Sequence, residues 1–509
     1  MLYFSSHKKP DNKSRVLFNN SSVSAAVMVT YRLIPLTWTT KSAIYILLGL
    51  FVIGVVLHLQ HPINAMAAVK DGKVDDAHYN TVGEDIDVIN LSLDLDQVKQ
   101  GDLGDSNSKI INDKWIVVTS ISKAPTDDLK KLSKIKGWKM VVVGDKKSPA
   151  LWDLPGVVFL SIDAQESIGF ETVEFLEYNC YQRKSVGYLY AIQHGAKFIY
   201  DTDDDNHPYN GIINFDDSNN DKQYLVFHAE PTQDYYNPMP HFGQSTLWPR
   251  GYPLNKISMP PVRTYKKCRN ARPLVQQGVV DGDPDLDAIQ RLTRKDNNVK
   301  FDVTFDHDAP PVILPDNSLT PYNTQNTILH YEAFFSLVLP QTVDGRVCDI
   351  WRSYFTQRLL WDIGGHLEYH TATAYQDRTP HDLLIDFIQE DDLYKKALSL
   401  TQFLLQWKGT KITVEERFFE MIKALYENKF VEALDVLLAR AWIRDLKRVG
   451  YNFPTIQKSK MVCEEKVVEF HPVEQGSMYL GMGEKTLNIL DLKPKIEEQV
   501  HHEPETEVQ

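Results

Sequence analysis

The chain has few cysteines, no excess of positive charge and no internal repeat, and each shortage excludes a class of protein. Its 509 residues include four cysteines, at positions 180, 268, 348 and 463, and no Cys-x-x-Cys pair. This spacing predicts neither a zinc site nor a disulfide-dense scaffold, although an oxidising compartment would allow one or two disulfides. The formal net charge of -13 and the lack of a basic, aromatic-laced patch argue against nucleic acid as a partner.

One segment near the amino end is apolar enough to cross a membrane. Residues 43–59 are almost wholly apolar, with basic residues before them and acidic residues after them. Because positive residues stay cytoplasmic, we expect residues 42–60 to be an uncleaved, single-pass, type II signal anchor. Residues 1–41 would then be a cytoplasmic tail. A cleaved signal peptide ending at residues 65–67 (Ala-Met-Ala) is the alternative.

Composition divides the rest of the chain. Residues 61–112 are polar and acidic, as in a flexible stem, and Asn90 begins an N-glycosylation sequon (Asn-Leu-Ser). We expect a packed domain over 113–400, a helical region over 401–480 and an acidic, disordered tail over 481–509.

The packed domain alternates strands with helices. The expected strands are 114–120, 138–143, 156–160 and 197–200, and the expected helices are 125–135 and 171–194, with Gly195 as a left-handed cap. This alternation predicts an α/β fold whose parallel sheet carries helices on both faces, as in Rossmann-type nucleotide-binding domains. Thr413 and Glu416 form a capping box that begins a helical hairpin.

Four aspartates follow the last of these strands. Asp201, Asp203, Asp204 and Asp205 would lie at the carboxyl end of the strand, where open α/β sheets bind ligands. Clustered carboxylates repel one another unless a cation lies among them, and hard divalent ions prefer oxygen ligands. We therefore expect Asp201, Asp203 and Asp205 to hold Mn²⁺ or Mg²⁺, with a solvated acidic turn as the alternative.

Known aspartate motifs narrow this interpretation. An EF-hand loop needs Gly and Glu where this chain has Asn206 and Ile212. A phosphatase of the haloacid-dehalogenase type usually has Thr or Val where this chain has Asp205. The remaining candidate is the Asp-x-Asp of GT-A glycosyltransferases, whose divalent metal bridges the diphosphate of a nucleotide sugar.

Longer motifs lie at 183–196, 240–251, 275–287, 321–327 and 346–352. They resemble the STELLO-type glycosyltransferases, which are best known from plant Golgi membranes, and the resemblance spans 114–385. The resemblance implies a Golgi membrane protein with a GT-A-like lumenal domain. Such a domain transfers sugar from a nucleotide sugar, UDP-sugar being favoured, to a glycan or glycoconjugate. A complex with other Golgi transferases is a further expectation.

Three residues are candidates for binding the donor. Asp145 follows the second strand and could accept hydrogen bonds from the base or ribose, or simply form a turn. Arg183 and Lys184 could face the diphosphate, since a planar guanidinium binds phosphate in bidentate fashion. For Lys184 a solvated helix face is the alternative.

An inverting transferase needs a carboxylate that takes a proton from the acceptor hydroxyl. Asp349 is the first candidate, and its alternative is an ion pair with an arginine. Asp281 and Asp283 are held in reserve, although Asp285 and Asp287 in the same cluster could instead begin a helix.

His366 and His370 would share a face on a helix and could complete a metal shell, but the Gly-Gly pair before them favours a loop. Trp248 and Trp351 could stack on a sugar or lie in the core. Two other functions stay open: a catalytically degenerate transferase that serves as a scaffold for another membrane enzyme, and a metal-dependent phosphatase.

Overall fold

The computed structural model describes residues 87–104, 110–150, 152–209, 222–228, 233–294, 302–378 and 382–475. The predicted cytoplasmic tail, anchor and acidic tail lie outside these residues. Among the residues that are described, no helix combines the length and apolar character that a membrane crossing needs.

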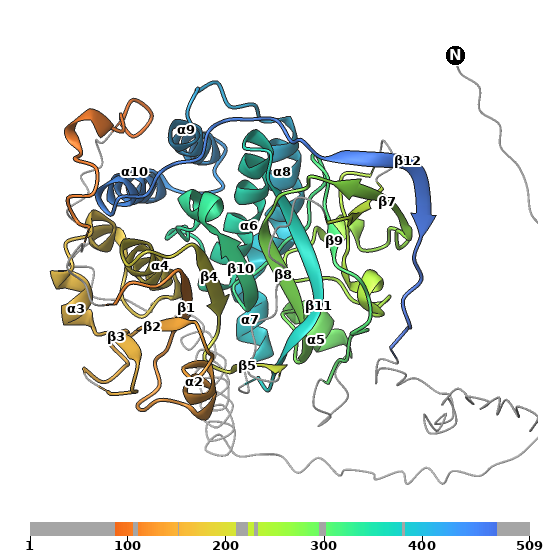
Figure 1. The fold of residues 1–509 in the computed structure, drawn as a ribbon, viewed down its shortest axis with the longest axis horizontal. Coiled ribbons are helices and arrows are strands. Elements are labelled where there is room, and N and C mark those ends of the chain that lie inside the picture. Colours follow the sequence, from red (N-terminus) through yellow and green to blue (C-terminus); the bar gives the residue numbers. More distant parts are fainter. Residues whose placement is uncertain are drawn as a thin grey trace, which may run out of the picture. The chain divides into compact units, whose positions relative to one another are not determined.

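The molecule is built around one large sheet (Figure 1). Its strands are β1 (Lys114–Thr119), β2 (Lys139–Val143), β3 (Val157–Leu160), β4 (Phe198–Thr202), β5 (Asn206–Pro208), β6 (Tyr224–Phe227), β7 (Thr264–Arg269), β8 (Pro273–Gly282), β9 (Val312–Ile313), β10 (Asn326–His330), β11 (His366–Gln376) and β12 (Val462–Glu469). The strand order is β12-β7-β6-β9-β11-β8-β10-β4-β1-β2-β3, and β5 pairs with β11.

Helices and 3-10 turns surround this sheet. The helices are α2 (Asp127–Leu132), α3 (Ile162–Ser167), α4 (Lys184–Gln193), α5 (Ala288–Arg294), α6 (Gly345–Asp362), α7 (Leu383–Gln389), α8 (Asp391–Gln406), α9 (Val414–Glu427) and α10 (Ala433–Arg448). The 3-10 turns are η2 (Leu95–Gln97), η3 (Glu171–Phe175), η4 (Tyr181–Arg183), η6 (Met239–Phe242), η7 (Leu254–Lys256) and η8 (Tyr331–Ser336).

The amino-terminal half of the sheet confirms the predicted parallel arrangement. Strands β3, β2, β1 and β4 pair in parallel, with α4 packed on one face and α2 on the other. Gly187 lets α4 approach the sheet, because a Cβ there would lie 2.7 Å from a methyl group of Val143. Gly195 ends this segment at φ +89°. The helix is shorter than expected, since η3, a loop and η4 occupy most of the stretch before Lys184.

The other half of the sheet is mixed. β10 pairs antiparallel with both β4 and β8, whereas β11 runs parallel to β8 and antiparallel to β9. The α/β class is confirmed and the large central sheet fits a Rossmann-like fold, but the expectation of a parallel sheet fails beyond β4.

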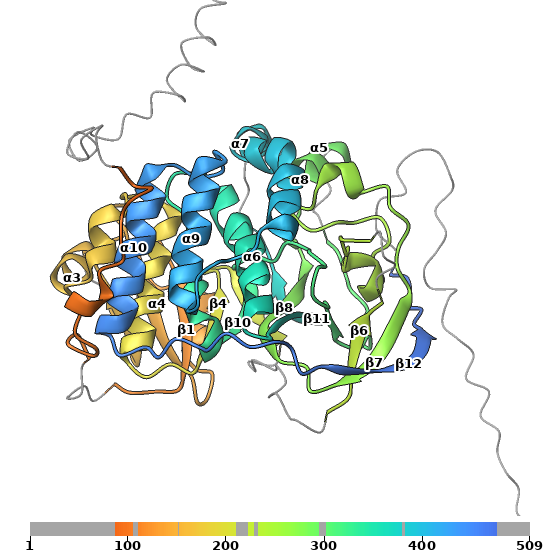
Figure 2. The ribbon, with the colours of Figure 1, turned by 90° about the horizontal axis from the view of Figure 1, so that it is seen from above.

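The predicted helical hairpin is formed by α9 and α10. The Thr413 hydroxyl accepts a hydrogen bond from Glu416 N, which confirms the cap. Figure 2 shows α4, α9 and α10 side by side. Residues 87–104 pack beside this hairpin, where Lys423 Nζ donates to the carbonyl of Ile89 at 2.8 Å. This part of the predicted stem therefore belongs to the packed domain.

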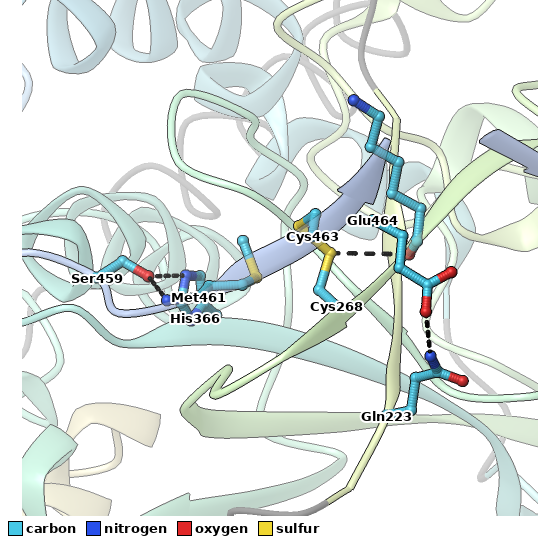
Figure 3. The surroundings of a disulfide bond; sticks show 8 residues. Gln223, Cys268, His366, Ser459, Met461, Cys463 and Glu464 are labelled. Carbon is cyan, nitrogen blue, oxygen red and sulfur yellow. Dashed lines mark hydrogen bonds between the residues drawn. A yellow bond between two sulfur atoms is a disulfide. The ribbon is translucent and has the colours of Figure 1, made fainter. Parts of the chain in front are cut away.

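The chain after α10 returns to the edge of the sheet instead of remaining helical up to residue 480. Gly450, at φ +87°, follows the end of the helix, and β12 then pairs antiparallel with β7. Cys463 lies directly opposite Cys268 in this pair, and the two form a disulfide (Figure 3). Cys180 and Cys348 are free thiols.

Candidate functional site

A cavity of about 520 Å³, here called the main cavity, opens where β4 ends and α6 begins. Its lining comes from the loop before η4, the acidic turn, the loop and first turn of α6, and the end of β11. The ionisable and hydroxyl side chains that line it include Glu177, Tyr181, Asp203, Arg250, Asp285, Thr324, Asp344, Arg346, Asp349 and Arg378.

The first aspartate of the acidic turn is buried and does not line this cavity. Asp201 belongs to β4 and its side chain is fully buried, with one oxygen 2.7 Å from Lys184 Nζ. Its other oxygen accepts a hydrogen bond from the Tyr188 hydroxyl at 2.7 Å and lies 3.4 Å from Arg352. We call these four residues the buried floor. Lys184 is therefore a buried partner of Asp201, which excludes the alternative of a solvated helix face, and it does not line the main cavity as a predicted donor-binding residue would.

Asp203 faces the main cavity and is 30% exposed. It accepts a hydrogen bond from the Tyr181 hydroxyl at 2.8 Å, and Lys184 Nζ lies 3.6 Å away. Burial against the surrounding protein raises the pKa of Asp203 to about 7. The negative charges of Asp205 and Asp201 act in the same direction, whereas Lys184 and the hydrogen bond from Tyr181 lower the pKa. Asp203 thus presents to the main cavity a carboxylate whose negative charge the protein compensates poorly.

The other two aspartates of the turn face neighbouring elements. Asp204 accepts a hydrogen bond from the Ser120 hydroxyl at 2.6 Å, and Asp205 accepts one from Gln376 Nε2 at 2.9 Å. Of the three predicted metal ligands, only Asp203 lines the main cavity.

Asp349 lies on the first turns of α6 and lines the same cavity. A chain of hydroxyl groups links it to Asp203: Tyr181 contacts Thr324 at 2.6 Å, and Thr324 donates to Asp349 at 3.4 Å. We call Asp203, Tyr181, Thr324 and Asp349 the cavity wall. This geometry places the candidate base and the open carboxylate of the acidic turn in one site.

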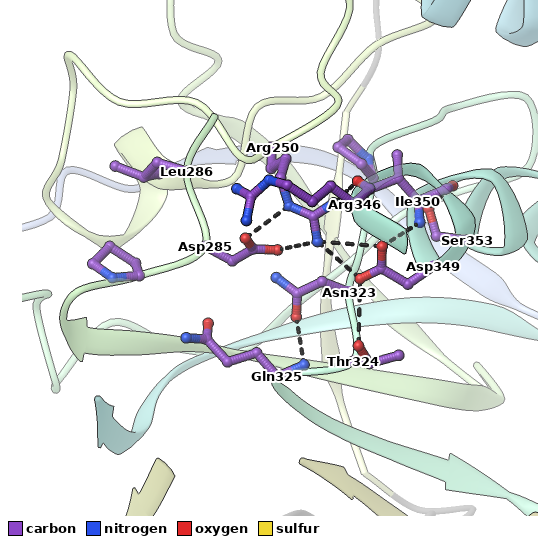
Figure 4. A network of polar contacts seen from close by, with 12 residues as sticks. Arg250, Asp285, Leu286, Asn323, Thr324, Gln325, Arg346, Asp349, Ile350 and Ser353 are labelled. Atoms are coloured by element: carbon purple, nitrogen blue, oxygen red, sulfur yellow. Dashed lines mark hydrogen bonds and ion pairs between the residues drawn. The ribbon is translucent and has the colours of Figure 1, made fainter. Parts of the chain in front are cut away.

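Arg250 fixes Asp349 (Figure 4). Its Nη2 lies 2.9 Å and 3.2 Å from the two Asp349 oxygens, and its guanidinium also binds Asp285 through two hydrogen bonds of 2.7 Å. Although burial acts in the opposite direction, Arg250 holds the pKa of Asp285 down at about 2. The Asp–Arg pair considered for Asp349 therefore exists, with Arg250 as its partner. Arg250 was not among the site residues predicted from the sequence, although it lies in the motif at 240–251.

The reserve candidates for the base lie elsewhere. Asp281 accepts hydrogen bonds from the Tyr209 hydroxyl at 2.6 Å and Phe305 N at 2.8 Å, and Asp283 pairs with Arg291. Neither lines the main cavity. Asp287 caps α5 by accepting from Gln290 N at 2.8 Å, which confirms the helix-start interpretation.

The predicted donor-binding residues face protein groups. Asp145 accepts hydrogen bonds from Asn179 N at 2.7 Å and Cys180 N at 3.2 Å, and so orders a loop that lines the cavity. The buried Arg183 donates to Gln165 Oε1 at 2.6 and 2.9 Å. The structure thus places neither Asp145 nor Arg183 against the main cavity.

The histidine pair lies on β11 and not on a helix. His366 contacts Ser459, and His370 contacts Glu368 at 3.2 Å. Across the described part of the chain, no three His, Cys, Asp or Glu side chains gather as a metal site. Trp351 is buried, whereas Trp248 lines a second cavity of about 420 Å³.

Sequence comparison gives these residues a family context. Residues 346–469, which include Asp349, β11 and the hairpin, match the family model of the STELLO glycosyltransferases. Two proteins of Arabidopsis thaliana, "Probable glycosyltransferase STELLO1" and "Probable glycosyltransferase STELLO2", are 37% and 36% identical to this chain over 388 residues. Each match covers 73% of this chain, which spans about half (50%) of the length of either relative.

Proposed function

Because this chain is a relative of the STELLO-type glycosyltransferases, we propose that it is a lumenal, metal-dependent glycosyltransferase. It would move a sugar from a nucleotide-sugar donor, a UDP-sugar by preference, to a glycan or glycoconjugate acceptor. The observation that carries this proposal is the shared cavity of Asp203 and Asp349, at the carboxyl end of β4. Such strand ends are where α/β sheets bind nucleotides, and we assign the domain to the GT-A-like type on that basis.

The residues present fit a divalent metal that arrives with its nucleotide. Mg²⁺ is usually held by one or two carboxylates together with substrate phosphates and water, and Mn²⁺ favours the same oxygen ligands. Asp203 supplies the open carboxylate, Asp205 is its acidic neighbour, and Asp201 belongs to the buried floor. The bound metal would offset the negative charge on the diphosphate.

We assign Asp349 as the base of an inverting transfer. It is the candidate base that lines the cavity, and Arg250 keeps its carboxylate in place. An ionised carboxylate can accept the proton of the acceptor hydroxyl. A retaining reaction would need no such base.

The disulfide supports the proposed location. Disulfides persist in oxidising compartments and are rare in the cytosol, so the Cys268–Cys463 bond favours a lumenal domain. With the anchor expected at 42–60, we propose a type II Golgi membrane protein that meets other Golgi transferases.

The phosphatase alternative loses support in this geometry. Its nucleophile would be the first aspartate of the motif, Asp201, whose side chain is fully buried between Lys184 and Arg352. A phosphate ester would have no route to it in this arrangement.

Calorimetric titration of the full chain with UDP and GDP, with and without Mn²⁺, tests the proposal. We expect a nucleoside diphosphate to bind only in the presence of the metal. If the folded protein binds neither nucleotide, the scaffold alternative replaces the transferase.

A further inference from the structure

Arg378 differs from the other arginines that line the main cavity. Arg250 pairs with Asp285 and Asp349, and Arg346 pairs with Glu390. Arg378 forms no hydrogen bond or ion pair with any residue that the structure describes, yet it lines the same cavity. A cation kept in a cavity without a carboxylate at ion-pair distance indicates a site for an anionic ligand.

The groups around Arg378 lower the pKa of its guanidinium but leave it charged. Burial, followed by the nearby cations Arg291 and Arg346, lowers its pKa to about 10, while Asp285 and Asp283 oppose this shift. The side chain is therefore still charged at neutral pH. Arg291 and Arg346 are engaged by Asp283 and Glu390, so an anion in the cavity would gain most from Arg378.

The fold ties Arg378 to the acidic turn. It follows the end of β11 by two residues, and the last residue of that strand, Gln376, is paired with Asn206 of β5. The Gln376 amide also donates to Asp205 at 2.9 Å. The strand end that carries Arg378 is thus fixed to the segment that carries Asp203, and both side chains line one cavity.

The amino end of α6 lies at the same cavity, but its own residues already cap it. This helix has 18 residues, and Asp344, Gly345 and Arg346 at its start line the cavity. The dipole at such an end favours a negative group, and the Asp344 carboxylate supplies one by accepting a hydrogen bond from Arg346 N at 3.0 Å. The cavity therefore offers a carboxylate for a metal and, in Arg378, a cation for phosphate oxygens.

We propose that Arg378 binds the diphosphate of the donor nucleotide. This inference rests on the proposed function and deepens it. Arg378 takes the phosphate-binding role that the sequence predicts for Arg183, whose guanidinium is engaged by Gln165 and the backbone carbonyl of Leu176. A guanidinium fork matches phosphate oxygens in bidentate fashion, which an ammonium group does not.

The test is calorimetric titration of the full chain and its variants with UDP, uridine and inorganic pyrophosphate, each with Mn²⁺ present. We expect Arg378→Gln to weaken UDP and pyrophosphate binding about 10- to 100-fold and to leave uridine binding unchanged, as expected for lost charge-assisted hydrogen bonds. Arg378→Lys, which keeps the charge, should lose less. Lys395→Gln, which removes an exposed charge on α8, is the matched control and should bind like the wild type.

The outcomes separate this inference from the proposed function. UDP binding that is equal in the wild type, Arg378→Gln and Arg378→Lys overturns the role of Arg378 and leaves the transferase proposal standing. Arg378-dependent binding of pyrophosphate without any binding of UDP or GDP keeps the anion site and removes the donor function. A wild-type protein that binds neither nucleotides nor pyrophosphate overturns both. Thermal unfolding of each variant accompanies the titrations, and we expect no change for Arg378→Gln.

Discussion

Asp201 and Asp203 are neighbours in sequence, yet one belongs to the buried floor and the other to the cavity wall. In the floor, Asp201 is fully buried and has Lys184 at 2.7 Å and Arg352 at 3.4 Å. In the wall, Asp203 is 30% exposed and its nearest cation, Lys184, is 3.6 Å away. Charge that the protein matches internally serves the fold, whereas charge left partly unmatched in a cavity is available to a ligand.

The largest effect is expected at the wall, on turnover. If Asp349 is the base, Asp349→Asn keeps the side-chain shape but cannot accept the proton, so the rate of sugar transfer should fall about 10²- to 10⁴-fold. Rates with a UDP-sugar that the wild type uses would show this. Asp285→Asn is the matched control, because it also removes a carboxylate from Arg250 but no base, and it should slow transfer less. Turnover of Asp349→Asn close to that of the wild type would mean a retaining reaction or another base.

The next effect is expected in the floor, on stability. Asp201→Ala leaves Lys184 and Arg352 buried without their shared carboxylate, which should lower the free energy of unfolding by about 3–5 kcal/mol. Asp203→Ala should change it little, because Asp203 is partly exposed. Chemical denaturation of both variants measures the difference. Equal stability of the two variants would contradict the division between floor and wall.

A smaller, pH-dependent effect on stability is expected at Asp435 of α10, which holds a loop that lines the main cavity. Asp435 accepts hydrogen bonds from Gln341 N and Thr342 N, in the loop before α6, and burial raises its pKa from 3.8 to about 6. The folded protein therefore binds this proton more tightly than the unfolded chain does. The resulting stability is complete below pH 3.8 and is lost as the pH rises through about 6.

Because asparagine does not titrate, the stability lost in Asp435→Asn should shrink as the pH rises. We expect the free-energy difference between wild type and variant to be smaller by about 1–3 kcal/mol at pH 7 than at pH 4. Denaturant unfolding at both pH values checks this. A difference that is the same at both values would show that the proton on Asp435 does not affect folding.

The buried floor and the cavity wall also show how much of the structure the sequence predicts. Local patterns predicted the parallel strands from β1 to β4, helix α2 and the hairpin, because each depends on residues close in sequence. The same local pattern predicted that the strand ends at Tyr200 and that Asp201 lies on the turn, whereas β4 continues to Thr202. The cations that allow Asp201 to be buried include Arg352, 151 positions away.

The contacts that the sequence did not predict are long-range pairings. Arg250 meets Asp349 across 99 positions, and Cys268 meets Cys463 across 195. Nothing near Arg250 or Arg378 in the sequence shows that the former is paired and the latter is not. Such a distinction appears only when β11, α6 and the acidic turn meet at one cavity.

The measurement that tests the account most directly is Mn²⁺-dependent UDP binding by Asp203→Asn, with its thermal unfolding followed in parallel. We predict that this variant unfolds at the wild-type temperature and loses metal-dependent UDP binding. Wild-type UDP affinity in a folded Asp203→Asn protein would contradict the assignment of the main cavity as the donor site.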